Sequence, residues 1–396
     1  MLLLERDGEP GGGLDRDADA AEALFREARR RRRRRLAIRL FVLAGACALA
    51  AALATAVSSD HSRPAASAGG SAGELPLGPA VTLHVAGALA VAPDGALYVT
   101  DVARDRILVR LGDGRFRVVV GSGTVGFAGD GGPALHAELN DVADLAFSPS
   151  GTLYIADAGR VRAVGRNGVI RTVAGDGRAR ERITTPTPAT AAPLGSLAAI
   201  RRSGTPLGLT VSTSGQLYIS TGSQILRLSA DGDLVPIRAR VLSPSFLRGD
   251  LNGFGPIAID ARGNVDVSGV NGWAVWQVAQ SGIARQVGAQ NLAGSQARRS
   301  GGNYSLLERG PGGFVYAENG DAILRIQGSR LVPAHLFGQT IRGQYFELTY
   351  FAFGPRGTIY ADDIPGGGAF EAHQQLLSVS HAEAHLLWQE SNRVHQ

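Results

Sequence analysis

Residues 126–139, GFAGDGGPALHAEL, form a glycine-rich segment with Asp130 at its centre. Segments of this kind bind phosphate when a helix N-terminus follows, and they bind calcium when carboxylates stand on alternate residues. Here the chain has no lysine to follow the glycines, the next expected element is a strand, and the alternating carboxylates are missing. We therefore interpret the segment as a structural connection in which Asp130 accepts hydrogen bonds from nearby backbone N–H groups.

The most metal-like spacing lies near the C-terminus, in His381-Ala-Glu-Ala-His385. On a strand, His381, Glu383 and His385 would share one face, and two imidazoles with a carboxylate could hold zinc. A solvated strand edge is the competing interpretation. No cofactor is predicted, and a divalent metal is kept only as an alternative.

Carboxylates that end equivalent strands give a second metal hypothesis. Asp101, Asp157 and Asp362 each follow a short apolar strand. If those strands surround one axis, the three carboxylates could hold a divalent cation. The competing interpretation is that each aspartate caps a local turn.

Covalent catalysis has no visible candidate in this chain. All 40 basic residues are arginine, which excludes Schiff-base and P-loop lysine chemistry. The single cysteine, Cys47, lies in an apolar run, and there is no Gly-x-Ser-x-Gly nucleophile motif. No catalytic residue is predicted.

The elements that would position these side chains are six recurring hairpins. Each phrase has a short apolar strand, a turn ending in glycine and a second strand, beginning at residues 89, 145, 209, 257, 306 and 351. Glycine supplies the positive φ that such turns need. The six turn glycines are Gly95, Gly151, Gly215, Gly263, Gly313 and Gly357.

Most phrases are followed by a third strand and often by a fourth. Four short antiparallel strands per repeat predict an all-β fold, a six-bladed β-propeller. Residues 81–87 have the pattern of an outer strand yet precede the first hairpin. We therefore expect the N-terminal strand to complete the last blade.

Residues 128–177 closely resemble an NHL repeat. The stretch runs from GDGGPA through LYIAD and an arginine-containing strand to TVAG, and the resemblance weakens in the later units. The resemblance implies a propeller that acts as a sensor or interaction domain, as in bacterial NHL-type propellers. The propellers of lactonases and lyases, related in shape, imply the alternative of a metal-dependent enzyme.

The N-terminal region has the pattern of a membrane anchor. Seven consecutive arginines end at Arg35, and the apolar run from Leu36 to Val57 is long enough to cross a bilayer. We expect a disordered cytoplasmic tail at 1–35, a transmembrane signal anchor at 36–57, a flexible linker at 58–79 and the propeller at 80–396. Secretion after cleavage near Ala56 is the alternative.

Beyond the N-terminal region the charges nearly balance, which argues against a nucleic-acid partner. The predicted function is therefore an extracytoplasmic, membrane-anchored, bacterial propeller that binds a protein or a cell-envelope ligand as a sensor or scaffold. The longest connection, 178–205, carries Arg178, Arg180 and Arg182. We expect this connection to be the binding loop, with an acidic partner.

Overall fold

The computed structural model divides into two compact units, residues 1–68 and 69–396. All described residues belong to the second unit. They are residues 75–178, 181–195, 207–222, 224–238, 240–241, 254–269, 275–287, 306–318, 323–334, 346–354, 357–365, 375–380 and 383–389. The predicted tail at 1–35 and membrane anchor at 36–57, with Arg35, Leu36 and Val57, lie outside the described residues.

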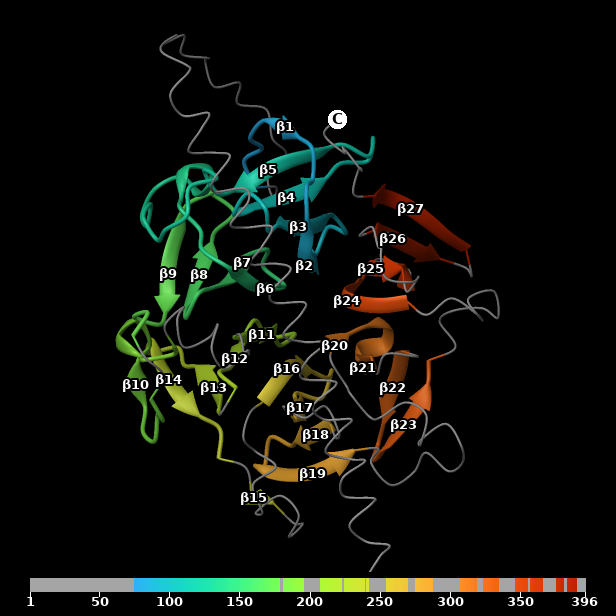
Figure 1. Cartoon of the computed structure of the whole chain (residues 1–396). Helices are drawn as coiled ribbons and strands as arrows, with labels where there is room; N and C mark the ends of the chain where they lie inside the picture. Colours follow the sequence, from blue (N-terminus) through green and yellow to red (C-terminus); the bar gives the residue numbers. More distant parts are fainter. Residues whose placement is uncertain are drawn as a thin grey trace, which may run out of the picture. The chain divides into compact units, whose positions relative to one another are not determined.

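The described part of this unit is all-β, and its strands form six sheets (Figure 1). The first sheet contains β1 (Ala80–Val81), β2 (Ala86–Val91), β3 (Leu97–Asp101), β4 (Arg106–Arg110) and β5 (Phe116–Val120). The second contains β6 (Val142–Phe147), β7 (Leu153–Asp157), β8 (Arg160–Val164) and β9 (Ile170–Ala174). The third contains β10 (Thr187–Pro188), β11 (Gly208–Val211), β12 (Leu217–Ser220), β13 (Ile225–Leu228) and β14 (Asp233–Pro236).

The remaining sheets follow the same order. The fourth contains β15 (Arg240–Val241), β16 (Phe254–Ile259), β17 (Val265–Gly269), β18 (Val275–Val278) and β19 (Ile283–Val287). The fifth contains β20 (Leu306–Arg309), β21 (Val315–Glu318), β22 (Ile323–Gln327) and β23 (Arg330–Pro333). The sixth contains β24 (Phe346–Phe353), β25 (Ile359–Pro365), β26 (Gln375–Ser380) and β27 (Glu383–Gln389).

The hairpin strands β2, β6, β11, β16, β20 and β24 surround a common centre. Each contacts the next in this order, and β24 contacts β2, so the ring is closed (Figure 1). Each of these strands pairs in antiparallel fashion with the strand that follows it. This arrangement is a β-propeller, with the sheets packed face to face around an axis.

The hairpins form where the recurring phrase places them. All six turn glycines have φ between +73° and +92°, a region that side chains rarely adopt. Apolar residues on alternate positions of the second strands, such as Val99 and Ile155, are fully buried between sheets. The sequence pattern and the burial pattern therefore agree at the level of the single hairpin.

The predicted fold, a six-bladed propeller of four-stranded blades preceded by a transmembrane helix, is wrong in the make-up of its blades. Within the described ranges, no helix is long and apolar enough to cross a bilayer. The helical turns described are short 3-10 segments, at Ala134–His136, Ala189–Ala191 and Pro311–Gly313. The sheets also differ from the four-stranded pattern, because β1, β10 and β15 each add a fifth strand.

The expected closure by the N-terminal strand is also wrong. β1 pairs with β5 in the first sheet, and β2 is the first hairpin strand of the same sheet. The sixth sheet takes all its strands from residues 346–389. The apolar pattern of residues 81–87 did not distinguish between a strand at the edge of the first sheet and one at the edge of the last.

Candidate functional site: a clamped connection and an axial pocket

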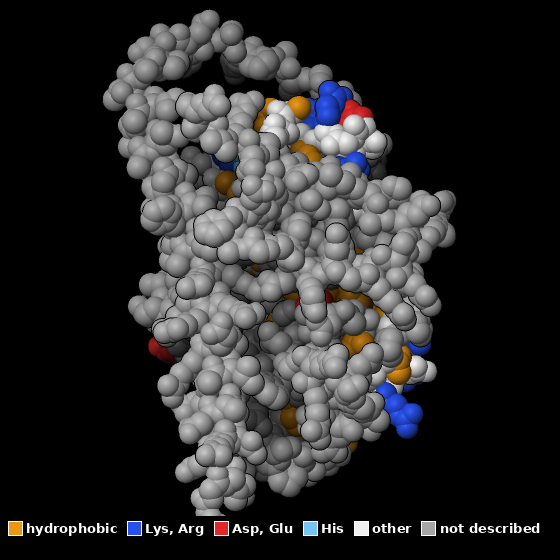
Figure 2. All heavy atoms as spheres, turned by 45° about the vertical axis from the view of Figure 1, so that its right-hand side comes forward, with side chains coloured by type: hydrophobic (Ala, Val, Ile, Leu, Met, Phe, Trp, Pro, Cys, Tyr) orange, Lys and Arg blue, Asp and Glu red, His pale blue; other side chains and the backbone are white. Residues whose placement is uncertain are grey.

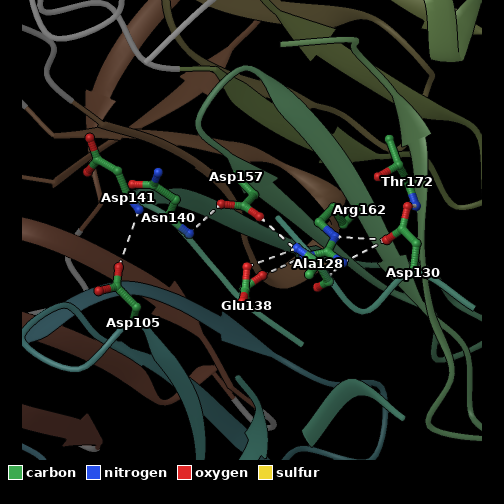
Figure 3. Close-up of polar contacts among 9 residues, drawn as sticks. All are labelled: Asp105, Ala128, Asp130, Glu138, Asn140, Asp141, Asp157, Arg162 and Thr172. Carbon is green, nitrogen blue, oxygen red and sulfur yellow. Dashed lines mark hydrogen bonds and ion pairs between the residues drawn. The ribbon is translucent and has the colours of Figure 1, made fainter. Parts of the chain in front are cut away.

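The segment around Asp130 is clamped by a buried arginine (Figure 3). Arg162 of β8 is fully buried, and its Nη2 donates to Asp130 Oδ1 at 2.7 Å. The same guanidinium donates to the carbonyl oxygens of Glu138, at 2.6 Å, and Ala128, at 3.3 Å. The other carboxylate oxygen, Asp130 Oδ2, accepts the Thr172 N–H at 2.8 Å. One arginine thus holds both ends of the connection between the first and second sheets.

These contacts engage both carboxylate oxygens of Asp130. Partial burial opposes ionisation, but the hydrogen bonds from Thr172 and Arg162 prevail and hold the pKa of Asp130 below its usual value. The carboxylate is therefore ionised and paired within the fold. The sequence predicted a structural role through a local turn, and the structure shows that the main partner is an arginine 32 residues away.

The predicted binding loop repeats this connection. Gly121 and Gly175 donate to the carbonyls of Ala134 and Ala189, and each connection then makes a 3-10 turn after a proline. The side chains of Arg106 and Arg160 donate to the carbonyls of residues 122 and 176 in the same way. The second connection is thus a near copy of the first over its described part, which favours an architectural role.

The three arginines of that loop are not brought together by any described contact. Arg178 is exposed and pairs with Asp176 at its own turn. Arg182 is exposed, and Arg180 lies outside the described residues. The expectation that these arginines meet an acidic partner stays a prediction.

The strand-end aspartates Asp101 and Asp157 have matching local roles. Asp157 accepts the N–H of Asn140 at 2.7 Å, and Asp101 accepts the N–H of Val85 at 3.3 Å. Each thus holds the segment that enters the hairpin strand of its own sheet. Asp101 also pairs with the Nδ1 atom of His84 at 3.0 Å.

Two of these aspartates are deeply buried, and Asp157 lies 3.6 Å from the Arg162 guanidinium. Burial raises the pKa of Asp157 to about 7, against the hydrogen bond from Asn140 and the charge of Arg162. In the sixth sheet, the strand position equivalent to Asp101 and Asp157 is held by Asp363. Asp362 is equivalent to Ala156 instead, because Asp362 pairs with Tyr350 as Ala156 pairs with Asp144. The three carboxylates of the metal hypothesis therefore do not share one strand position.

The C-terminal metal candidates cannot be placed as a site. His381 lies outside the described residues, and for Glu383 and His385 only the backbone, in β27, is described. Within the described ranges, no group of three His, Cys, Asp or Glu side chains is placed to hold a metal ion.

A pocket lies where the hairpin strands meet at the centre of the ring. Its volume is about 560 Å³, and it is lined by residues of β2, β6, β11, β20 and β24 and by the turns that follow the last two. Figure 2 shows hydrophobic and acidic side chains together near the middle of one face of the molecule. We call this hollow the axial pocket.

Glu308 of β20 lines the axial pocket and departs from the pattern of the other sheets. It pairs across the hairpin with Tyr316. The same position in the other sheets holds Ala90, Ala146, Thr210, Ala258 and Ala352. Small residues therefore satisfy the packing at this position five times, and a carboxylate is not needed for the fold.

A second carboxylate, Asp144 of β6, lies near enough to affect Glu308. Asp144 accepts the N–H groups of Leu145, at 2.8 Å, and Leu209 of the next sheet, at 2.7 Å. Burial raises the pKa of Asp144 to about 7. Burial, and then the charge of Asp144, raises the pKa of Glu308 to about 8, against the opposing charge of Arg309.

The sequence analysis missed Glu308, although a signal was present. When the six phrases are aligned on their turn glycines, Glu308 stands five residues before Gly313, where the others have alanine or threonine. Asp144 carried no such signal, because its partner Leu209 lies 65 residues further along the chain.

Comparison with known proteins supports the repeat assignment. Residues 123–194 match the family model described as the Teneurin NHL domain. This part of the chain is similar to an NHL repeat, and the fold around it is a β-propeller. Human Teneurin-1 is 34% identical over 101 residues, which is 22% of this chain and 4% of that protein. The chain thus spans only a small fraction of the curated relative that it matches.

Two solved structures are similar to this chain at low sequence identity. Virginiamycin B lyase from Staphylococcus aureus is 13% identical with a TM-score of 0.45, and the match covers 76% of this chain and 83% of the lyase chain. A gluconolactonase from Xanthomonas campestris is 12% identical with a TM-score of 0.42, covering 70% and 82%. At these TM-scores, neither similarity supports an argument about activity.

Proposed function

We propose that this NHL propeller is a ligand-binding module and that the axial pocket is its binding site. The observation that carries the proposal is Glu308, a half-buried carboxylate in a pocket where five equivalent positions hold alanine or threonine. A charged group at such a position costs stability unless a partner compensates it. A ligand that pairs with Glu308 would supply that partner and would explain the carboxylate at the centre of the ring.

The proposal includes a location outside the cytoplasm. The arginine block at 29–35 and the uncharged apolar run after Arg39 support tethering to a membrane with the propeller on the far side. A ligand or partner of the cell envelope would then reach the axial pocket. This part of the proposal rests on the sequence alone.

The test is enrichment of small molecules from a cell extract on the purified full chain, read by mass spectrometry. A pocket-filling variant, Ala146→Leu, provides the comparison, because Ala146 is half-buried and lines the pocket. The matched control is Ala103→Leu in an exposed turn. We expect a compound that is retained by the wild type and by Ala103→Leu and is lost with Ala146→Leu. Equal retention by all three proteins would refute the proposal.

A further inference from the structure

We propose that the axial pocket recognises a ligand through a single positively charged nitrogen group, an ammonium or a guanidinium, that pairs with Glu308. This inference rests on the proposed function and adds the chemical class of the ligand. Three observations carry it: the hydrogen bonds of the two carboxylates, the charges that line the pocket, and the position of Glu308 in the repeat.

Glu308, which lines the pocket, and the neighbouring Asp144 differ in their hydrogen bonds. Asp144 receives a backbone N–H on each of its oxygens, one from its own strand and one from β11. It therefore has a structural role in joining the second and third sheets. Glu308 receives no hydrogen bond from the residues that the structure describes, so its lone pairs remain available to a donor.

The charges around Glu308 favour a cation. Within the described lining, the charged residues are Glu308 and Arg309, both of β20. Asp144 of β6 does not line the pocket, but it lies close enough for its charge to act on Glu308. The lining residues from β2, β11 and β24 are uncharged. Two carboxylates and one guanidinium leave a net charge of −1 when all are ionised. One ammonium or guanidinium group would neutralise this charge, whereas an anion would add to it.

Proton release should accompany binding. The raised pKa values mean that Glu308 and Asp144 hold protons near neutral pH. A bound cation favours their ionised forms, so it lowers both pKa values and displaces protons. Affinity should therefore rise by up to about a hundredfold per pH unit near pH 6, where both groups release a proton, and by up to about tenfold per pH unit between pH 7 and 8, where the release comes mainly from Glu308; it should level off above about pH 8.

The test is titration calorimetry of the full chain with butylamine and butylguanidine, each carrying one positive charge, at pH 6, 7, 8 and 9. Butyrate and butanol serve as the anionic and neutral controls. We expect the two cations to bind with the pH dependence above, and we expect heats in buffers of different ionisation enthalpy to show proton release. Tripeptides Gly-Lys-Gly and Gly-Arg-Gly distinguish a free amine from a cationic side chain of a partner protein as the source of the group.

Variants separate the charge effect from damage to the fold. Glu308→Gln keeps the shape and removes the charge, so we expect at least a tenfold loss of cation affinity and loss of the pH dependence between pH 7 and 8. Arg309→Gln removes the competing cation, so we expect tighter binding. Circular dichroism of both variants checks that the sheets remain intact.

The proposal is overturned if neither cation binds at pH 9, if butyrate or butanol binds as tightly as butylamine, or if Glu308→Gln binds cations as the wild type does. If the extract experiment retains a neutral or anionic compound in the pocket, the cation inference fails and the ligand-binding function stands. If no compound is retained and no cation binds, both fail.

Discussion

At the scale of the residue, the propeller holds two ionisable groups in opposite circumstances. Arg162 is fully buried and is surrounded by carbonyl and carboxylate acceptors. Glu308 is half-buried and receives no hydrogen bond from the described residues. The first arrangement stabilises the fold, whereas the second costs stability and points to a ligand.

Replacing Arg162 by methionine should destabilise the propeller strongly. The change removes the guanidinium from the carbonyls of Ala128 and Glu138 and from the carboxylates of Asp130 and the buried Asp157, which should cost about 3 kcal/mol or more. Urea unfolding of Arg162→Met measures the loss. Arg166→Met is the control, because Arg166 is exposed, and we expect it to stay within about 0.5 kcal/mol of the wild type. Equal losses in the two variants would show that the clamp is unimportant.

Replacing Glu308 by alanine, the residue found in most other sheets, should make the fold less sensitive to alkaline pH. The pKa of Glu308 is raised to about 8 in the fold, above its unfolded value of about 4.3. The folded state therefore binds a proton that the unfolded state lacks, and stability falls as pH rises between these values, by on the order of 1 kcal/mol per pH unit at most.

The measurement is thermal unfolding of Glu308→Ala and wild type at pH 5 and pH 9. From pH 5 to pH 9, the free energy of unfolding of the wild type should fall more than that of Glu308→Ala. Thr210→Ala, at the same strand position in the third sheet, should show no such movement. A pH-independent difference for Glu308→Ala would mean that its carboxyl group is compensated within the fold.

At the scale of the element, the hairpin pattern predicts the strands but does not predict the conformation of the connections between sheets. The first and second connections share their 3-10 turns, their backbone hydrogen bonds and their arginine contacts. Gly159, in the turn between β7 and β8, lies so close to the end of the second connection that a Cβ there would overlap the carbonyl oxygen of Gly195. The connections therefore pack on the sheets through backbone contact.

A pair of glycine substitutions isolates this contact. Gly159 and Gly215 have nearly the same φ, +88° and +85°, but a Cβ at Gly215 would meet open space. Gly215→Ala should cost about 1 kcal/mol, from the positive φ alone. Gly159→Ala should cost at least about 2 kcal/mol more, because the backbone must shift. Guanidinium unfolding compares the two, and equal costs would argue against close packing of the connection.

At the scale of the whole molecule, the ring is closed by packing of the first and sixth sheets without an exchanged strand. β2 contacts β24, while β1 stays on β5 in the first sheet. The segment before β2 stabilises the first sheet. Leu75 is buried in the core, the Gly78 N–H donates to the Val118 carbonyl of β5, and the Arg117 side chain of β5 donates to the Gly78 carbonyl. The N-terminal segment therefore stabilises the first sheet, and the ring is closed by the contact between β2 and β24.

Truncation distinguishes these roles. A fragment of residues 82–396 should be less stable than one of residues 70–396 by about 2–3 kcal/mol, from exposure of the Leu75 site and the lost hydrogen bonds. Its far-UV circular dichroism should keep the β-sheet signal, because the sixth sheet does not depend on the deleted residues. Loss of the folded signal would mean that residues 70–81 are needed to close the ring.

The sequence by itself determined the hairpins, the repeat and the NHL character, because turn glycines and alternating apolar residues are local signals. The tertiary structure decided how the ring closes and which partner Asp130 has. It also brought Asp144 close enough to Glu308 for its charge to raise the pKa of Glu308, although the two residues lie far apart in the chain. Contacts between sheets depend on packing around the axis, which no single repeat of the sequence encodes.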